Sequence, residues 1–323
     1  MKAVIQTKYG GPELLQFQDV PKPVAAEDEI LVRVQAVSVN RSDWETLTGR
    51  PFYARIGGLF NPGPRILGSD IAGRVEMVGK NNNVFQPGDE VFGEMEEYHG
   101  GFAEYVRTRG TAWALKPSGI TFEQAAAIPQ AGVIALQGIR DQGQVRPGQK
   151  VLINGAGGGA GSFAVQLAKV YGAEVTGVDN AEKLDFIRSL GADHVIDYTR
   201  EDFTKSREQY DLILDLIAHR SVFAYSRALK PDGSYFAVGG NVSTLLQIAL
   251  LGGSIRRRTS RNVRVLMVRR THEDLLAITE LCESGKIVPY IDRRFPLSEV
   301  PAALRYLGEG HALGKLVINV ADG

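Results

Sequence analysis

A short apolar stretch that runs into a cluster of glycines constrains the fold of this chain more than any other feature. The apolar residues 151–153 lead into the glycine-rich loop 154–161, and a helix-like run follows at 162–171. A strand, a tight turn and a helix in this order are typical of a dinucleotide site, in which a pyrophosphate lies on the helix N-terminus. The sequence therefore predicts a dinucleotide-binding unit that begins at this strand.

The small residues of this loop have distinct expected roles. Gly158 lets the backbone approach the phosphates, and Gly161 lets the helix pack closely on the strand. Ala156 then takes the first position of the glycine fingerprint. The loop residues expected to bind the cofactor are Ala156, Gly158, Gly159, Ala160 and Gly161. A purely structural glycine-rich turn is the alternative interpretation, and the strand–helix units that follow the loop disfavour it.

Strands alternate with short helices around and beyond this loop. Strands are predicted at 150–154, 174–179, 194–197, 211–216 and 234–238, with helices at 159–171, 181–190 and 220–229. This alternation predicts an α/β fold, a doubly wound parallel sheet with helices on both faces and a crevice at the strand ends. Farther along, the expected elements are a helix-like segment at 245–251, a strand at 263–268, helices at 273–283 and 298–308, and a strand at 316–320.

The first third of the chain has a different pattern, rich in β-structure. Alternating or continuous apolar residues, separated by Gly and Pro pairs, predict strands at 30–37, 71–78 and 90–92. We expect a compact, irregular barrel there. The stretch 121–138 is expected to be helical, beginning with a capping box of Thr121 and Gln124 and broken or kinked at Pro129.

Composition excludes several classes of function. A chain of 323 residues suits two domains. Lys and Arg number 37, as do Asp and Glu, so the formal net charge is zero and no overall field attracts nucleic acid or an anionic membrane. Residues 1–5 read as a strand rather than a signal peptide, and no apolar run is long enough to span a membrane. The single cysteine, Cys282, precludes an internal disulfide, and we expect a cytoplasmic location.

One basic run departs locally from this neutral balance. Arg256–Arg258 are followed by Arg261 and Arg264. We expect a solvated loop and strand edge there rather than a nucleic-acid site, because no aromatic stacking platform accompanies the arginines. The alternative is that one of these arginines helps to bind a phosphate.

Several motifs occur in the order found in one protein family. The matching segments are 1–15, 64–73, 85–91, 101–105, 191–198 and 314–317. They resemble the zinc-independent, zeta-crystallin-like quinone oxidoreductase branch of the medium-chain dehydrogenase/reductase superfamily. The resemblance implies a GroES-like catalytic domain at 1–120, completed by 292–323, and a Rossmann dinucleotide-binding domain at 121–291. It also implies a homodimer, in which the apolar strand at 263–268 pairs across a two-fold axis.

The resemblance also bears on metal binding. Zinc members of the superfamily place a histidine in a Gly-His-Glu sequence, and the corresponding residues here are Gly68, Ser69 and Asp70. They also use cysteine ligands, whereas the only cysteine of this chain, Cys282, falls in a predicted helix. The five histidines are scattered without ligand spacing. We therefore expect no zinc.

The choice between NADPH and NADH depends on the end of the second strand of the dinucleotide-binding domain. Asp179 lies where an acid commonly bonds the ribose 2′-hydroxyl, which favours NADH. Lys183 and Tyr198 correspond to residues that hold the 2′-phosphate in similar quinone oxidoreductases, which favours NADPH; the alternative for Lys183 is an exposed lysine. The resemblance slightly favours NADPH. The remaining expected cofactor contacts are Gly239, Gly240 and Lys315.

The reacting end is expected beside a loop that begins at Asn40. In similar proteins an Asn-x-x-Asp loop lies beside the nicotinamide, and Asn40 and Asp43 form it here. Asn40 is expected to hold the carboxamide or the substrate oxygen, and Asp43 to brace the loop or to act in catalysis. Tyr53 is the expected phenolic donor. The expected substrate-pocket residues are Glu45, Phe52 and Ile134.

Together these features predict hydride transfer from NAD(P)H to a small, quinone-like conjugated carbonyl acceptor, without zinc. The cofactor carries the chemistry, while the protein orients it against the acceptor and excludes water. Two alternatives stay open. One is reduction of the double bond of an enone or enal, and the other is a protein that binds NAD(P)H without turnover.

Overall fold

The computed structural model describes residues 1–55, 58–63, 65–96 and 99–320. The chain forms two compact units. The first unit comprises Met1–Gln130, Arg270–Ser284 and Pro289–Gly323, and the second comprises Ala131–Arg269 and Gly285–Val288. The expected domain limits, 1–120 with 292–323 and 121–291, stay a prediction. Residues 321–323, at the end of the first expected domain, lie outside the described residues.

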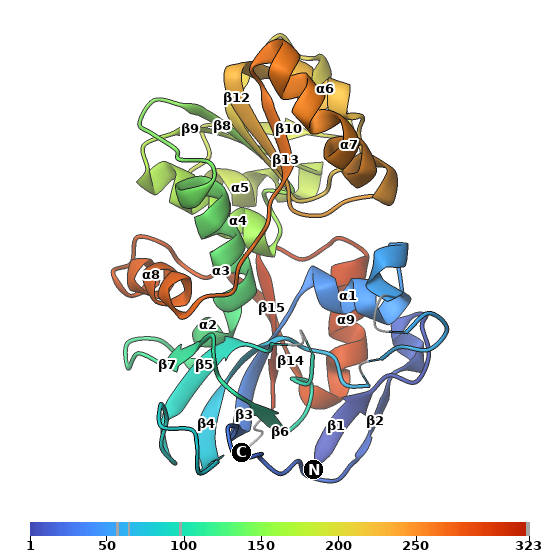
Figure 1. Ribbon diagram of the computed structural model, residues 1–323, viewed down its shortest axis with the longest axis vertical. Helices are drawn as coiled ribbons and strands as arrows, with labels where there is room; N and C mark the ends of the chain where they lie inside the picture. The colour runs from blue at the N-terminus through green and yellow to red at the C-terminus, as the bar shows by residue number, and fades with distance from the viewer. Residues whose placement is uncertain (56–57, 64, 97–98, 321–323) are drawn as a thin grey trace. The chain divides into compact units, whose positions relative to one another are not determined.

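The second unit is built on a six-stranded parallel sheet (Figure 1). In spatial order its strands are β10 (His194–Asp197), β9 (Glu174–Asp179), β8 (Lys150–Asn154), β11 (Tyr210–Asp215), β12 (Leu229–Ala237) and β13 (Asn262–Val265). From β8 the chain moves outward through β9 and β10, and it then moves the other way through β11 to β13. Because parallel crossovers are right-handed, the connecting helices of the two halves cover opposite faces. The gap between the ends of β8 and β11 is the switch point where such sheets bind ligands.

The connecting helices follow the predicted alternation. They are α4 (Gly159–Val170), α5 (Leu184–Ser189), α6 (Val222–Arg227) and α7 (Val242–Thr259), and α3 (Pro129–Leu136) precedes the sheet. Figure 1 shows α6 and α7 beside β12 and β13. The predicted doubly wound α/β fold is therefore confirmed. β13 is shorter than the predicted strand, and the predicted helix at 181–190 is divided into the 3-10 turn Ala181–Lys183 and α5.

The expectation of a loop and strand edge is wrong for Arg256–Arg258, which form the last turn of α7, whereas Arg261 lies in the connection after this helix and Arg264 lies in the edge strand β13. Two glycines, Gly252 and Gly253, separate this run from the apolar segment and do not end the helix. A Cβ on Gly252 would lie 2.4 Å from the carbonyl oxygen of Val263, so glycine lets α7 pack against β13. The glycine pair thus reflects close packing rather than a helix terminus.

The first unit contains a seven-stranded sheet and a separate hairpin. The strands of the sheet are β14 (Ile291–Pro296), β15 (Lys315–Asn319), β3 (Ile30–Val39), β4 (Asp70–Val78), β5 (Glu90–Glu94) and β7 (Trp113–Leu115), with β6 (Tyr105–Thr108) also paired to β3. The hairpin is β1 (Lys2–Ile5) with β2 (Gln16–Asp19). The antiparallel pairing of β15 with β3 brings the C-terminal part of the chain into the β-rich unit.

Among the described residues of this unit, four α-helices accompany these strands. They are α1 (Arg41–Thr48), α2 (Phe122–Ala127), α8 (His272–Glu283) and α9 (Val300–Gly308). The predicted capping box of α2 is confirmed, since Thr121 Oγ1 accepts the N–H of Gln124 at 3.2 Å. The break at Pro129 is also confirmed, because Pro129 begins a new helix. Among the described residues, no helix combines the length and the apolar character needed to cross a membrane.

Candidate functional site

The glycine-rich turn after β8 is fixed by backbone contacts with β9. The N–H groups of Gly155 and Ala156 both donate to the carbonyl oxygen of Val178, at 2.9 and 3.1 Å. Gly155 has a φ of +84°, a conformation that favours glycine. A Cβ on Gly161 would lie 2.1 Å from the carbonyl oxygen of Gly155. Only glycine therefore lets the start of α4 come this close to the turn.

The first turn of α4 leaves its backbone donors available. Gly158 is the N-cap residue, and no side chain caps the helix there. A Cβ on Gly158 would meet its nearest atom at an ordinary 3.5 Å, so the missing side chain leaves open space at the helix start. The free N–H groups and the helix dipole favour an anion at this point. Gly159 and Ala160 belong to the same turn, and these residues fit a dinucleotide pyrophosphate.

Asp179, at the end of β9, faces this turn. Its Oδ2 accepts the N–H of Gly157 at 3.0 Å, and its Oδ1 accepts the N–H of Asn180 at 2.9 Å. Lys183 Nζ lies 4.0 Å from Asp179 Oδ1. The side chain of Lys183 is only 9% exposed and that of Asp179 only 7%. Lys183 is therefore not the exposed lysine of the alternative expectation. The carboxylate is held between the glycine turn and a buried ammonium.

Gly157 has a role that the motif alone does not reveal. A Cβ there would approach the side chain of Lys183 at 2.8 Å and Asp179 Oδ2 at 3.1 Å. Tyr198 also borders this strand end, because its N–H donates to the carbonyl oxygen of Asp179 at 3.1 Å while its side chain is exposed. The structure thus brings together the predicted residues Asp179, Lys183 and Tyr198 beside the turn.

Gly239 and Gly240 follow the end of β12, as predicted from the sequence. A Cβ on Gly240 would lie 2.1 Å from the carbonyl oxygen of Ala218, and its φ is +146°. Gly239 has open space around it. Ile134 lies half-buried in α3 of the same unit. Gly240 is therefore required by the fold itself, whether or not a ligand approaches it.

A buried carboxylate lies at the switch point. Asp215, fully buried at the end of β11, accepts from Asn154 Nδ2 at 2.8 Å and from the N–H of Ile217 at 3.0 Å on one oxygen. Its other oxygen accepts the Tyr235 hydroxyl at 2.8 Å. Burial raises the pKa of Asp215, and these donors lower it in part. Sequence reasoning missed this role, although an acid ending an apolar strand was a visible signal.

The loop that follows Asp215 is held against the glycine turn. The Tyr225 hydroxyl accepts the N–H groups of His219 and Arg220, both at 3.0 Å. Ile217, about half-exposed, extends toward Gly155, where an added Cβ would lie 3.0 Å from its Cδ1. The loop 216–220 therefore forms a fixed wall beside the cofactor turn.

The first unit contains a buried polar cluster around Asn40. Asn40 Oδ1 accepts the ammonium of Lys315 at 2.5 Å, and its Nδ2 donates to Ser69 Oγ at 3.1 Å. Lys315 is 2% exposed, and its Nζ lies 3.7 Å from Asp70 Oδ2. Asp43 Oδ2 accepts the backbone N–H of Asn40 at 2.7 Å, which forms the capping box of α1. Asn40 and Asp43, predicted as one loop, thus meet Lys315, predicted separately as a cofactor contact, in one cluster.

The carboxyl groups of this cluster have raised pKa values. Burial raises the pKa of Asp43 to about 7, although its Oδ1 also accepts the N–H of Gly68 at 2.9 Å. Burial, and secondly the charge of Asp70, raise the pKa of Glu94 to about 8. Gln130 connects the two acids, because its Nε2 donates to Glu94 and its N–H donates to Asp70, at 2.8 and 3.1 Å. Sequence reasoning did not identify Glu94 or Gln130.

These residues do not fit a zinc ion. Ser69, at the position of the zinc-binding histidine, accepts the amide N–H of Asn40 with its hydroxyl oxygen, and the ammonium of Lys315 donates to the oxygen of the same amide. An ammonium there repels a divalent cation. Cys282 is distant in sequence on α8, and burial raises the pKa of its thiol to about 12. Within the part of the chain that the structure describes, no three His, Cys, Asp or Glu side chains are grouped to hold a metal.

The remaining predicted acceptor-side residues lie near the end of α1. Glu45 Oε1 is 3.6 Å from Arg41 Nε. Burial raises the pKa of Glu45, while Arg41 and the neighbouring Tyr53 hydroxyl oppose this shift. Phe52, beside Tyr53 in a short 3-10 turn, is 67% exposed. Glu45 and Tyr53 thus come together, and Phe52 presents an apolar ring to solvent.

Comparisons with known proteins agree with both units. Residues 26–138 match the alcohol dehydrogenase GroES-like domain, and residues 190–318 match the zinc-binding dehydrogenase family. The 2-methylene-furan-3-one reductase of Solanum lycopersicum is 34% identical over 99% of this chain and 79% of that protein. The chloroplastic NADPH-dependent alkenal/one oxidoreductase of Arabidopsis thaliana is 34% identical over 98% and 79%. The solved quinone oxidoreductase from Coxiella burnetii superposes with a TM-score of 0.88 at 30% identity, covering 99% of each chain.

Proposed function

This chain belongs to the medium-chain dehydrogenase/reductase superfamily, among its quinone oxidoreductases and alkenal reductases, and we propose that it reduces a small conjugated carbonyl compound with NAD(P)H. The observation that carries this function is the uncapped start of α4 at Gly158, with Asp179 and Lys183 beside it. A bound reduced nicotinamide supplies the hydride. The chain is accordingly an oxidoreductase. Its own residues bind the cofactor, orient it against the acceptor and exclude water.

NADPH is the proposed preferred cofactor. The buried ammonium of Lys183 offsets the carboxylate of Asp179, and both oxygens of that carboxylate already accept backbone N–H groups. The repulsion between Asp179 and a 2′-phosphate is thereby reduced. The Arabidopsis relative is named as NADPH-dependent. NADH is the alternative, because Asp179 keeps acceptor capacity toward a ribose hydroxyl.

For the acceptor we propose a quinone or an enone. Asn40 keeps one amide hydrogen for a substrate oxygen or a carboxamide, since only the other donates to Ser69. Asp43 holds the backbone that positions Asn40. Tyr53, beside Glu45, is the proposed proton donor. Phe52 and Ile134 are the proposed apolar contacts of the acceptor.

Double-bond reduction is the second candidate, and two of the relatives favour it. The Solanum and Arabidopsis proteins are named for a methylene-furanone and for alkenals or enones, whereas the Coxiella protein is named a quinone oxidoreductase. Product analysis after anaerobic turnover separates the two candidates. A hydroquinone identifies quinone reduction, and a saturated ketone or aldehyde identifies double-bond reduction. Failure with both acceptors would contradict the proposed function.

We further propose that the reaction needs no zinc. The ammonium of Lys315 and the amide of Asn40 support this, because they occupy the cluster around Ser69. Turnover should survive exhaustive dialysis against a chelator, with no zinc in the active sample by elemental analysis. Activity that is lost on chelation and restored by zinc would contradict a metal-free reaction.

A homodimer and a cytoplasmic location complete the proposed function. β13 is the last strand of the parallel sheet, so its outer edge can pair with the same strand of a second copy. Met267, just beyond this strand, is 72% exposed. Sedimentation velocity should give a species of twice the chain mass, and a monomer at micromolar concentration would exclude the dimer. Cell fractionation tests the location.

A further inference from the structure

A pocket lies at the edge of the parallel sheet opposite the glycine turn. Its residues come just before three neighbouring strands: Arg207 precedes β11, Arg227 precedes β12 and Arg261 precedes β13. The glycine turn instead follows β8, at the carboxyl edge. A strand of six residues such as β11 separates the two edges by about 20 Å. The pocket, about 560 Å³ in volume, is therefore distinct from the cofactor turn.

The pocket is strongly cationic. Besides the three arginines, Lys205, Thr204 and Ser206 line it. Within the described chain, Arg207, Arg227 and Arg261 form no ion pair with a carboxylate. Lys205 is at most loosely paired, with its Nζ 4.0 Å from Asp202. The unpaired guanidinium groups thus leave a surplus of positive charge.

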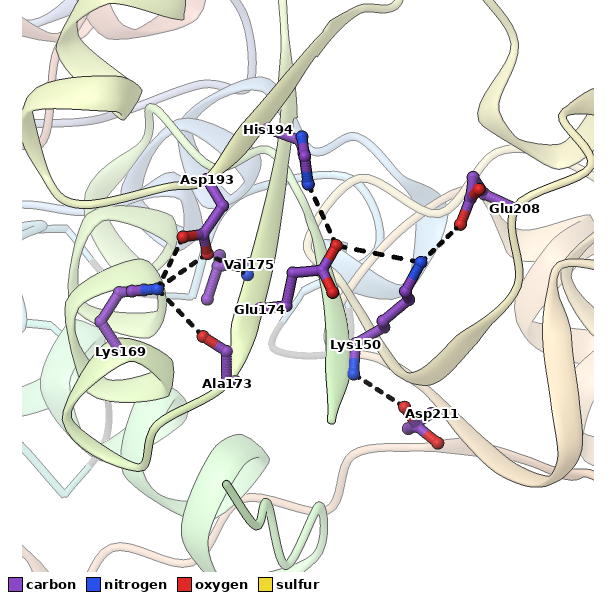
Figure 2. A network of polar contacts seen from close by, with 9 residues as sticks. All are labelled: Lys150, Lys169, Ala173, Glu174, Val175, Asp193, His194, Glu208 and Asp211. Atoms are coloured by element: carbon purple, nitrogen blue, oxygen red, sulfur yellow. Dashed lines mark hydrogen bonds and ion pairs between the residues drawn. The ribbon is translucent and has the colours of Figure 1, made fainter. Parts of the chain in front are cut away.

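The acids of the same segment are directed to other partners. Asp202 accepts Arg220 at 2.6 Å and also the Thr204 hydroxyl at 2.7 Å. Glu208 bonds Lys150 Nζ at 2.9 Å, and Figure 2 shows its carboxylate turned to that lysine. Neither acid is therefore available to neutralise the arginines of the pocket.

Arg261 adds an independent observation. It follows Ser260, whose φ of +59° ends α7 and turns the chain into β13. The Nε of Arg261 is buried, and the described residues offer it no hydrogen-bond acceptor. A buried N–H without an acceptor is unfavourable, so an acceptor from a ligand would satisfy it.

We propose that this pocket binds a small phosphate-bearing anion. Guanidinium groups bind phosphate oxygens through paired N–H donors, and three of them converge here without competing carboxylates. The Ser206 hydroxyl, which accepts the N–H of Glu208, keeps its own hydrogen for a further oxygen. The volume is in the range of pockets that hold small organic ligands, so the phosphate is expected to carry an organic group.

Calorimetric titration of the full chain with inorganic pyrophosphate and with ribose 5-phosphate tests this site. NADPH at saturation keeps the probes away from the glycine turn. We expect both probes to bind the wild type, ribose 5-phosphate more tightly, and both affinities to fall about tenfold or more in Arg261→Gln. Arg258→Gln makes an equal charge change at an exposed position of α7 outside the pocket, and it should alter the affinities less than twofold.

Three results would overturn the site. The first is that neither probe binds the wild type saturably. The second is an equal loss of affinity in Arg258→Gln and Arg261→Gln, and the third is an unchanged affinity in Arg261→Gln. Circular dichroism verifies that both variants fold. This site is independent of the proposed reaction. If NADPH itself failed to bind, binding of the two probes that depends on Arg261 would persist. Any binding of the probes at the glycine turn would be insensitive to Arg261→Gln.

Discussion

Lys315 shows how one buried charge organises its surroundings. Its ammonium lies between the amide of Asn40 and the carboxylate of Asp70, with almost no exposure to solvent. Burial lowers the pKa of Lys315, and the acids around it oppose that shift. Because the amide oxygen of Asn40 is committed to this lysine, only its remaining N–H is free for a ligand. The Asn-x-x-Asp loop therefore serves first as part of a charge cluster.

Asp179 is the residue on which cofactor choice is predicted to depend. Asp179→Ser should raise the affinity for NADPH relative to NADH several-fold, because it removes the negative charge beside the 2′-position. Both affinities should also weaken, since the acceptor for Gly157 N–H is lost. Asp179→Asn is the matched control, because it keeps an acceptor oxygen. Dissociation constants from fluorescence titration give the ratio, and an unchanged ratio in both variants would remove Asp179 from cofactor selection.

Glu94 is predicted to make stability depend on pH. Its pKa rises from 4.5 to about 8 on folding, so the folded protein keeps a proton that the unfolded chain has released. The free energy of unfolding should therefore fall as the pH rises from about 5 to 8. Glu94→Gln, which can still accept from Gln130, should flatten this slope and be more stable than the wild type at pH 8.

Urea denaturation at several pH values provides the measurement for Glu94. Glu104→Gln, at a half-buried position just before β6 and outside the buried cluster, is the control and should keep the wild-type slope. Parallel stability curves for Glu94→Gln and the wild type would show that Glu94 is ionised in the folded protein at neutral pH.

At the scale of elements, Asp215 joins the two segments that border the switch point. The carboxylate connects the end of β8, through Asn154, to the loop after β11, through Ile217. The Tyr235 hydroxyl, from β12, donates to the other oxygen of the carboxylate. The glycine turn and its neighbouring wall are therefore held by one buried acid rather than by loop residues alone.

Asp215→Asn should loosen this junction. The groups of Asn154, Ile217 and Tyr235 that contact the carboxylate are all donors, so an amide NH₂ would face a donor and leave it unpaired. We expect a loss of about 1–3 kcal/mol in the free energy of unfolding, together with weaker binding of the reduced cofactor. Tyr235→Phe removes one hydroxyl only and should cost about 1 kcal/mol. Equal stability of Asp215→Asn and wild type in urea would refute the bridging role.

The elements differ in how well the sequence predicts them. The strands β8, β9 and β10 were predictable because apolar runs and turn residues are local signals. The continuation of α7 through Gly252 was not, because the reason is a contact with Val263 in another element. Similarly, Gly161 could be predicted from the motif, whereas Gly157 depends on the burial of Lys183.

On the scale of the whole molecule, each unit supplies a different kind of chemistry. The parallel unit presents backbone donors at the start of α4, which suit phosphate groups. The β-rich unit gathers Asp43, Asp70, Glu94 and Lys315, distributed over four separate parts of the chain, into one buried cluster. Sequence motifs located each segment, but the cluster arises from the pairing of β15, β3, β4 and β5, which no local pattern specifies.

The most direct test of the proposed function is the anaerobic oxidation of the reduced cofactor on addition of a simple quinone or an enone. NADPH and NADH should be run in parallel, with a blank lacking the protein and with Gly161→Val, whose side chain would collide with Gly155, as an inactive control. We predict loss of nicotinamide absorbance that depends on both protein and acceptor, faster with NADPH. No protein-dependent oxidation of either cofactor with either acceptor would contradict the assignment as a reductase.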